Sequence, residues 1–196
     1  MIVIVLAAAY LIGSLPFGYI MSKMLLKTDI RNHGSGNIGA TNVLRVAGWC
    51  YALPVFILDA LKGFVAVLLA RAVSDLPVVY LAAGLLAMLG HSFPLYLKFK
   101  GGKAAATGIG VLAALSGWVL LVLVVSAGII VGITRYVSLG SIIGSILVPL
   151  TFLLLGYDWP YILFGVGVAA LVVLRHKDNI KRLLAGTESK LGQKAK

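Results

Sequence analysis

Four short segments of this chain gather glycine, hydroxyl, amide and basic side chains, which are groups that bind phosphate in proteins. The first segment, residues 29–45, holds three glycines and three asparagines between Asn32 and Asn42. Glycine lets successive backbone N–H groups converge on one anion, and an arginine fork suits phosphate. The segment predicts an anion site, with an ordinary polar loop between helices as the alternative. Its candidate binding residues are Ser35, Gly36, Asn37, Thr41, Asn42 and Arg45.

The second segment, residues 98–108, reads KFKGGKAAATG. It differs from a nucleotide-binding P-loop, which has GxxxxGK[ST] after a strand, because Ala104 follows the lysine and no strand precedes it. A Gly-Gly-Lys string that opens a helix nevertheless points free N–H groups, the helix dipole and an ammonium in the same direction. Lys98 and Lys100 are explained by the orientation of a membrane span, and Lys103 is not. The candidates here are Gly101, Gly102, Lys103 and Thr107.

The third and fourth segments also lie at helix ends. In residues 134–141, Ser138 is a plausible N-cap, and Ser141 would lie one turn further, facing the same cavity. In residues 175–182, His176 and Asn179 are spaced i, i+3 and can share a helical face. Three scattered histidines without an acidic cluster make no metal site. We expect neither a metal nor a cofactor.

The composition makes lipid the solvent for most of the chain. Of its 196 residues, 61% are hydrophobic and 12% are charged, and the mean hydropathy is +1.05. A soluble domain carries about 25% charged residues. The net charge of +11 would suggest nucleic acid in a soluble protein. In a membrane protein it sets the orientation, and no nucleic-acid partner is expected.

Seven apolar stretches can be drawn, against a requirement of about 20 residues for a full span. Residues 104–133 are long for one span and short for two, so we choose between these alternatives by the side on which each places the basic residues. Two short spans turning at Ser116-Gly117 place 15 of the 17 basic residues on the inner side. We therefore predict an all-α bundle of about seven transmembrane helices, with the N-terminus outside and the C-terminus cytoplasmic. The stretches are residues 2–21, 47–70, 77–97, 104–115, 118–133, 139–155 and 159–174.

This topology predicts a single domain over residues 1–196, in which residues 175–196 form a basic, interfacial cytoplasmic tail. All four donor-rich segments then lie on one side, as a polyanion pocket at the mouth of the bundle. Asp59 and Lys62 lie mid-span at i, i+3, and they are either functional or a structural ion pair. His91 has no acidic residue near it in the sequence, so we expect only a polar contact there.

At these segments the chain resembles the bacterial acyl-phosphate:glycerol-3-phosphate acyltransferase family (PlsY-type). The matching strings are GSGNIGATN at residues 34–42, KGGKAAAT at 100–107, RYVSLGS at 135–141 and RHKDNIKRLLAGTE at 175–188, and DALKG at 59–63 is also similar. Four motifs in the right order, over nearly the whole chain, are highly specific. One departure is Ala105, where the family commonly has a larger aliphatic residue.

The resemblance implies transfer of a fatty acyl group from acyl phosphate to the 1-hydroxyl of glycerol 3-phosphate, giving lysophosphatidate for phospholipid synthesis. It also implies a multi-pass protein of the bacterial cytoplasmic (inner) membrane with its active site on the cytoplasmic side. The expected partners are the two substrates and the lipid bilayer, with other enzymes of phospholipid synthesis as candidates. We assign Ser35, Lys103, Ser141 and the backbone N–H groups of Gly36, Gly101 and Gly102 to phosphate and the carbonyl oxyanion. Arg45, His176 and Asn179 are assigned to glycerol 3-phosphate, with Asn37, Thr41, Asn42 and Thr107 in support.

No acyl-enzyme intermediate is expected, because acyl phosphate is already activated. Another acyltransferase class uses a His-x4-Asp pair, which none of the three histidines offers. Our hypothesis is that an oxygen of the substrate phosphate takes the proton of the acceptor, with His176 as the rival base. Two other functional classes stay open: a transporter or flippase for an anionic solute or lipid, and a non-catalytic scaffold. A transporter more often has inverted repeats, and none stands out here.

Overall fold

The computed structural model describes residues 1–193, and these residues form helices and loops without a β-strand. The all-α prediction is confirmed. Two basic residues of the predicted tail, Lys194 and Lys196, lie outside the described residues. The α-helices are α1 (Ile2–Gly13), α2 (Phe17–Leu25), α3 (Ala40–Ala47), α4 (Trp49–Arg71), α5 (Pro77–Ser92), α6 (Ala105–Leu115), α7 (Gly117–Thr134), α8 (Val137–Leu154), α9 (Trp159–Arg175) and α10 (Lys177–Leu184), and 3-10 turns cover Ile30–Asn32 and Leu95–Leu97.

Each predicted apolar stretch contains a helix. The helices α4, α7 and α8, and α5 with its continuation to Leu97, are long and apolar enough to cross a bilayer. Two bent pairs, α1–α2 and α9–α10, qualify when each pair is one span, which gives four to six spans. With 11 residues, α6 is about 16 Å long, roughly half of the apolar thickness of a bilayer. The count of seven crossings and the side of the N-terminus stay predictions.

The first stretch, predicted as one span over residues 2–21, is broken. The axes of α1 and α2 differ by 41° across the segment between them. Pro16 causes the break, because it has no N–H to donate and its ring disfavours helical geometry in the preceding residue. The carbonyl oxygen of Leu15 instead accepts a hydrogen bond of 2.8 Å from Lys62 Nζ of α4. A broken helix at membrane depth needs such a substitute partner.

The predicted turn at Ser116-Gly117 is confirmed. The Ser116 side chain caps α7 by accepting from the N–H of Val119. The preceding helix α6 is shielded by close packing on α4: a Cβ at Gly110 would lie 1.7 Å from the carbonyl oxygen of Ala60. Only a glycine permits this approach, and it keeps a helix too short for a full span among protein neighbours.

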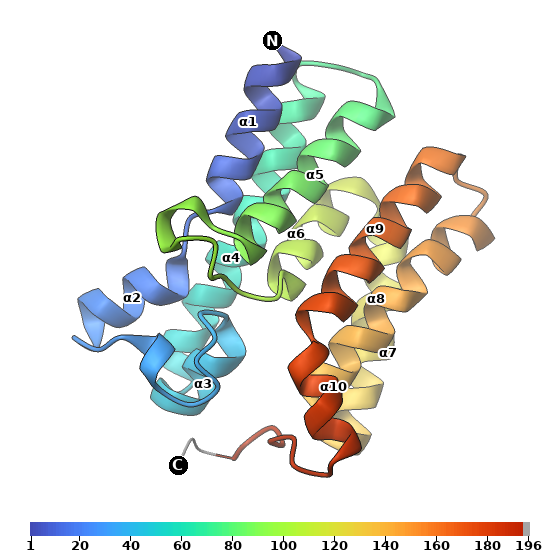
Figure 1. Ribbon diagram of the computed structural model, residues 1–196. Helices are drawn as coiled ribbons and strands as arrows, with labels where there is room; N and C mark the ends of the chain where they lie inside the picture. The colour runs from blue at the N-terminus through green and yellow to red at the C-terminus, as the bar shows by residue number, and fades with distance from the viewer. Residues whose placement is uncertain (194–196) are drawn as a thin grey trace.

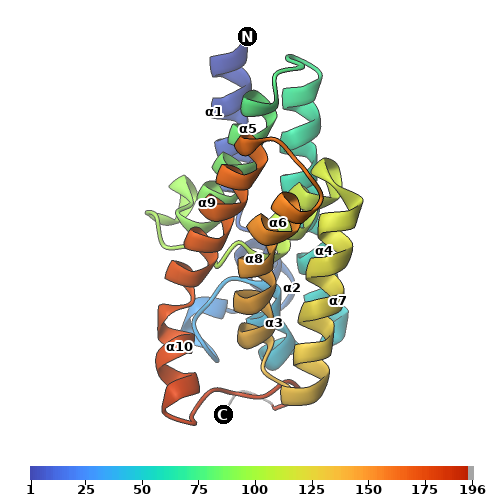
Figure 2. The same cartoon turned by 90° about the vertical axis from the view of Figure 1, so that its right-hand side faces the viewer.

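Figures 1 and 2 show the N-terminus at one end of the bundle and α3, α10 and the C-terminal segment at the other. The loop between α5 and α6 turns back midway between these ends, so α6 starts inside the bundle. The outer helix α7 leaves large apolar side chains exposed, including Trp118, Ile129 and Ile133, as a lipid-facing helix would. A small apolar core of Ile30, Ile38, Val43, Ala52, Val55 and Leu97 fastens the region around α3 to α4.

Candidate active site

A cavity of about 360 Å³ lies where the four donor-rich segments meet. Nine of the thirteen predicted site residues line it, although they come from positions as distant as Ser35 and Asn179. The polar lining comprises Ser35, Asn37, Thr41, Asn42, Arg45, Asp59, His91, Lys103, Ser138, Ser141, His176, Asn179 and Glu188, and the apolar lining includes Phe56, Ala105, Ala106, Ile109, Ala127, Gly128 and Val131. The cavity therefore offers phosphate ligands on one side and an apolar wall from α4, α6 and α7 on the other.

Asn42 organises the first segment from its centre. Its side chain is buried, and its Nδ2 donates to the carbonyl oxygens of Ile30, His33 and Asn37 at 2.9–3.3 Å. Its Oδ1 accepts from the backbone N–H of Ser35 at 2.8 Å. Both hydrogens of the Asn42 amide are therefore used to shape the loop. The residue presents Ser35 to the cavity and does not itself offer a donor to a ligand.

Lys103 projects into the cavity from the start of α6. The following residue, Ala104, is the N-cap and has a left-handed backbone (φ 58°), which turns the chain into the helix. Lys103 Nζ donates to Asn179 Oδ1 of α10. Burial, reinforced by the nearby charge of Arg182, lowers the pKa of Lys103 to about 8. An ammonium that is poorly hydrated and held by a neutral amide is a strong phosphate ligand.

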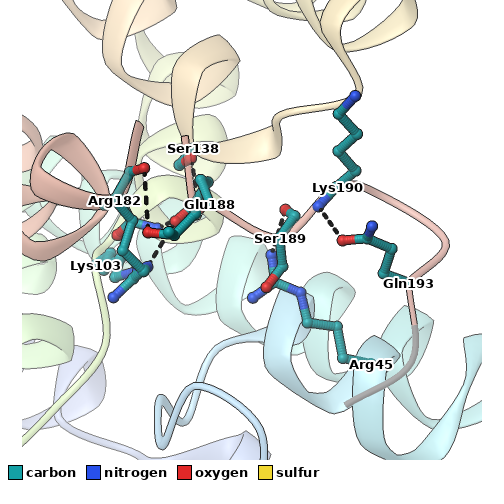
Figure 3. Close-up of polar contacts among 10 residues, drawn as sticks. Arg45, Lys103, Ser138, Arg182, Glu188, Ser189, Lys190 and Gln193 are labelled. Atoms are coloured by element: carbon teal, nitrogen blue, oxygen red, sulfur yellow. Dashed lines mark hydrogen bonds and ion pairs between the residues drawn. The ribbon is translucent and has the colours of Figure 1, made fainter. Parts of the chain in front are cut away.

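Glu188 is one of two buried carboxylates in the cavity lining, with Asp59, and the sequence pattern did not predict it as a site residue. Its Oε1 accepts from Ser138 Oγ (2.8 Å) and Asn179 Nδ2 (2.7 Å), and its Oε2 accepts from Arg182 Nε (2.7 Å). Figure 3 shows Glu188 between Ser138, Arg182 and Lys103. Burial opposes ionisation, but these hydrogen bonds outweigh it and lower the pKa of Glu188. The predicted N-cap role of Ser138 is wrong, because its hydroxyl is turned to Glu188 and the N-cap of α8 is Tyr136.

His176 lies at the junction of α9 and α10, 3% exposed. Its Nδ1 lies 2.8 Å from the carbonyl oxygen of Val172, and since a carbonyl only accepts, Nδ1 must carry the hydrogen. Burial lowers the pKa of His176 to about 4, so the ring is neutral at pH 7 and its Nε2 is an acceptor. A neutral imidazole of this tautomer can accept a hydrogen bond from a hydroxyl group.

The C-terminal segment leaves α10 and runs across the end of the bundle at which α3 lies (Figures 1 and 2). Arg45 Nη2 donates to the carbonyl oxygen of Ser189 at 3.2 Å. The backbone of Leu191 pairs with Arg135, donating to its carbonyl oxygen (2.7 Å) and accepting from its Nη2 (2.8 Å). These contacts fix the segment that carries Glu188. The predicted tail thus contributes Glu188 to the cavity lining, and its interfacial position stays a prediction.

Four predicted site residues are absent from the cavity lining: Gly36, Gly101, Gly102 and Thr107. The Gly36 N–H donates to the His33 carbonyl (3.1 Å) and closes a turn, and the Gly102 N–H donates to the His91 carbonyl near the end of α5 (2.9 Å), so neither group faces an anion. Thr107 is fully buried against Gly63 of α4.

His91 makes polar contacts, as expected, but one of them is with an acidic residue that is distant in the sequence. Asp59 Oδ1 of α4 lies 3.4 Å from His91 Nδ1, and both residues line the cavity. The contact joins residues 32 positions apart on two different helices, so no local spacing could reveal it.

The comparisons with known proteins agree with this geometry. The family described as glycerol-3-phosphate acyltransferase matches residues 3–186. The curated glycerol-3-phosphate acyltransferase of Desulforamulus reducens is 47% identical over 192 residues, which cover 98% of this chain and 96% of that protein. The chain belongs to the glycerol-3-phosphate acyltransferase family.

Further family members support the assignment. Glycerol-3-phosphate acyltransferase 2 of Moorella thermoacetica is 45% identical, and 97% of each chain is covered. The crystal structure of PlsY (YgiH), an integral membrane glycerol 3-phosphate acyltransferase, in its glycerol 3-phosphate form has a TM-score of 0.93 and 41% identity, over 97% of this chain and 96% of that chain. Its lysophosphatidic acid form has a TM-score of 0.88 and 39% identity, over 97% and 95%. The family and the integral membrane fold predicted from the motifs are confirmed, and the transporter alternative gains no support.

Proposed function

We propose that the protein transfers a fatty acyl group from acyl phosphate to the 1-hydroxyl of glycerol 3-phosphate, giving lysophosphatidate and phosphate. The observation that carries this proposal is the convergence of Ser35, Arg45, Lys103, Ser141, His176 and Asn179 on one cavity, in a chain of the acyltransferase family. Both substrates carry a phosphate, and the related solved structures are described as a glycerol 3-phosphate form and a lysophosphatidic acid form.

The cations of the cavity are suited to two phosphates. Lys103 approaches from the start of α6 and Arg45 from α3, so the two charges come from different elements of the bundle. The hydroxyl of Ser35 adds a neutral donor. The Ser141 hydroxyl donates to the carbonyl oxygen of Val137 at 3.0 Å and must turn away from it to donate to a substrate. We assign Ser35, Lys103 and Ser141 to the phosphate and carbonyl oxygen of the acyl donor. Arg45, His176 and Asn179 are assigned to glycerol 3-phosphate, with Asn37 and Thr41 in support.

The acyl chain needs an apolar path that leads away from the phosphates. Phe56 of α4, Ile109 of α6 and Val131 of α7 line one side of the cavity. Most of α7 faces outward, with 6% of its span buried. An acyl chain lying along these residues would therefore reach the bilayer directly, while its carbonyl stays beside the polar wall.

The reaction needs positioning and charge stabilisation more than a protein nucleophile. The 1-hydroxyl oxygen attacks the acyl carbon, the bond between that carbon and the phosphate oxygen breaks, and phosphate leaves with the electron pair. Lys103 and the serine hydroxyls stabilise the oxyanion and the leaving group. The hydroxyl proton passes to the departing phosphate, so no acyl-enzyme and no cofactor are required.

His176 has a different task in this scheme. With a neutral ring and Nε2 as acceptor, it orients the attacking hydroxyl or, in the rival mechanism, takes its proton. A pKa of about 4 makes it a weak base at pH 7, which favours the phosphate oxygen as the acceptor. Loss of an ionisation from the kcat profile of His176→Ala would support the histidine instead.

The cellular setting follows from the same chemistry. We propose a single domain in the bacterial inner membrane, with the cavity open to the cytoplasm, since glycerol 3-phosphate is a water-soluble metabolite. The basic groups around the cavity fit the cytoplasmic side by the charge bias of membrane proteins. Enzymes that make acyl phosphate or consume lysophosphatidate are candidate partners.

The test is acyl transfer by purified protein in detergent or lipid, supplied with palmitoyl phosphate and labelled glycerol 3-phosphate, without coenzyme A or acyl carrier protein. We expect labelled lysophosphatidate. Lys103→Ala should lower kcat/KM by about 10- to 200-fold, the range for loss of one charged hydrogen bond. Lys100→Ala is the matched control, because Lys100 is exposed in the same loop and does not line the cavity.

Equal losses in the Lys103→Ala and Lys100→Ala variants would contradict the assigned site. A folded protein that makes no lysophosphatidate while its acyl phosphate stays intact would contradict the proposed function. Transport of labelled glycerol 3-phosphate into sealed vesicles by the same preparation would then favour the transporter class.

A further inference from the structure

Three ionisable side chains form a buried cluster directly beneath the Gly101–Lys103 loop. Lys62 Nζ lies 2.7 Å from Asp59 Oδ1 and 2.8 Å from His91 Nδ1. The exposed fractions of Asp59, Lys62 and His91 are 1%, 3% and 4%. Charges at membrane depth are costly and default to function. Neither the proposed chemistry nor the assigned substrate ligands use this cluster.

The cluster connects three parts of the bundle through one ammonium group. Asp59 and Lys62 belong to α4, and His91 lies near the end of α5. The same Lys62 Nζ donates to the carbonyl oxygen of Leu15 at the break between α1 and α2. This ammonium therefore makes two hydrogen bonds, to Leu15 and His91, and an ion pair with Asp59. The break in the first span, the middle of α4 and the end of α5 are therefore held in one fixed arrangement.

The contact with Lys62 also sets the tautomer of His91. Because an ammonium only donates, Nδ1 of His91 must accept from Lys62, and the neutral ring carries its hydrogen on Nε2. The Nε2 edge of the ring lies against Gly102: a Cβ at Gly102 would be 1.9 Å from it. The Nδ1 edge of His91 thus contacts Lys62, and its Nε2 edge contacts the backbone of Gly102.

The loop itself is clamped on two sides. The His91 carbonyl accepts the N–H of Gly102 at 2.9 Å. On the other side, Arg175 donates from Nε to the carbonyl oxygen of Gly102 and from Nη2 to that of Gly101, both at 3.0 Å. The next residue is Lys103, whose ammonium meets Asn179 in the cavity. A displacement of the His91 ring would therefore move the peptide that directs Lys103.

We propose that Asp59, Lys62 and His91 are positioning residues for the acyl transfer, which hold the Gly101–Gly102 peptides so that Lys103 reaches the substrate phosphate. The inference rests on the proposed function. The cluster acts through the loop backbone, because Gly102 covers the outer edge of the His91 ring and Asp59 is engaged by Lys62. The alternative role for this ion pair is to stabilise the bundle, and the two roles differ in a measurable way.

The first test is a double-mutant cycle between His91 and Lys103. We expect His91→Ala to lower kcat/KM by about 100-fold, as a misplacement of about 1 Å does. In a Lys103→Ala background the same change should cost less than about threefold, because its effect passes through Lys103. His91→Asn should recover part of the loss, since its amide oxygen can accept from Lys62 as Nδ1 does.

The matched control is Tyr161→Phe, which removes the 2.7 Å hydrogen bond between the Tyr80 and Tyr161 hydroxyls in the same bundle. These tyrosines do not line the cavity. We expect a lower melting temperature from this change, with unaltered kcat/KM per folded molecule. Equal losses from His91→Ala in the native and Lys103→Ala backgrounds would overturn the inference.

A second variant covers the case in which His91→Ala does not fold. The double change Asp59→Leu and Lys62→Met removes both charges together, so no unpaired charge stays buried, and such replacements are often neutral for stability. A folded double variant with native kcat/KM assigns the pair to stability alone and overturns the inference. A folded variant that loses activity, with a raised KM for acyl phosphate, supports it.

A binding measurement separates this inference from the proposed function. Inorganic phosphate is titrated into the detergent-solubilised protein by calorimetry, with no acyl transfer involved. We expect the double variant to weaken phosphate binding about tenfold, the effect of losing one good hydrogen bond to Lys103. Unchanged phosphate affinity would refute the positioning role even if acyl transfer proved not to be the reaction. Failure of acyl transfer by the native protein would refute the proposed function alone.

Discussion

The lowered pKa of Lys103 predicts an alkaline limit of catalysis. With a pKa of about 8, the protonated fraction of Lys103 falls from about 0.9 at pH 7 to about 0.1 at pH 9. If the ammonium binds the substrate phosphate, kcat/KM should fall about tenfold over this interval, because kcat/KM reports the ionisation of the free enzyme. A bound phosphate favours the charged lysine and raises its pKa. The inflection in kcat should therefore lie at a higher pH than the inflection in kcat/KM.

The assay is lysophosphatidate formation at several pH values from 7 to 9.5, at constant ionic strength. Phosphate monoesters lose their second proton near pH 6, so the substrates are almost fully ionised throughout. Lys103→Arg is the matched variant, since a guanidinium stays charged over the whole range. We expect lower activity from this variant at pH 7, where its shape fits less well, and a flat profile up to pH 9.

Two results would refute this reasoning. A native kcat/KM that stays constant to pH 9.5 would mean that Lys103 does not titrate or does not take part. A tenfold fall that persists in Lys103→Arg would assign the alkaline limit to another group.

Three further substitutions test the packing around the cavity. Glu188→Gln leaves Arg182 without its carboxylate and should lower the free energy of unfolding by about 1–3 kcal/mol, measured by thermal unfolding in detergent; an unchanged melting temperature would contradict the role given to Glu188. Gly102→Ala places a methyl group 1.9 Å from His91 Nε2 and should lower kcat/KM by about 100-fold, whereas Gly132→Ala, with open space around its Cβ, should be neutral; equal activities would contradict the clamped loop. Thr107→Val replaces a buried hydroxyl that has no hydrogen-bond partner, so activity should persist and the free energy of unfolding should rise by about 1 kcal/mol. A large loss of activity would instead indicate that Thr107 contacts the substrate.

The helices could be predicted from the sequence because membrane spans leave a long and continuous apolar signal. The break between α6 and α7 followed from charge, since Arg135 and the tail reach the inner side only if residues 104–133 turn at Ser116. The same distribution of basic residues predicted that the four donor-rich segments lie on one side of the membrane. Nine of the predicted site residues consequently meet in one cavity.

The parts of the site that the sequence did not predict depend on contacts between segments that are distant in the chain. Glu188 contacts Ser138 only because the C-terminal segment folds back to pair with Arg135. No spacing pattern in the sequence predicts this contact. His91 meets Asp59 only through the relative rotation of α4 and α5, which hydrophobic periodicity does not determine. The glycine N–H groups were expected to face an anion, but Gly36 donates within its own turn and Gly102 donates to the carbonyl oxygen of His91 near the end of α5.

The partners of the cations indicate which of them are available to a substrate. Arg182 is paired with a carboxylate, Glu188 Oε2, at 2.7 Å. Arg45 and Lys103 instead donate to neutral oxygens, the carbonyl of Ser189 and the side-chain amide of Asn179. A phosphate dianion competes well with a neutral acceptor and poorly with a buried carboxylate that already has three donors. Glu188 therefore neutralises Arg182, which does not line the cavity, while the positive charges of Arg45 and Lys103 remain for the two substrate phosphates.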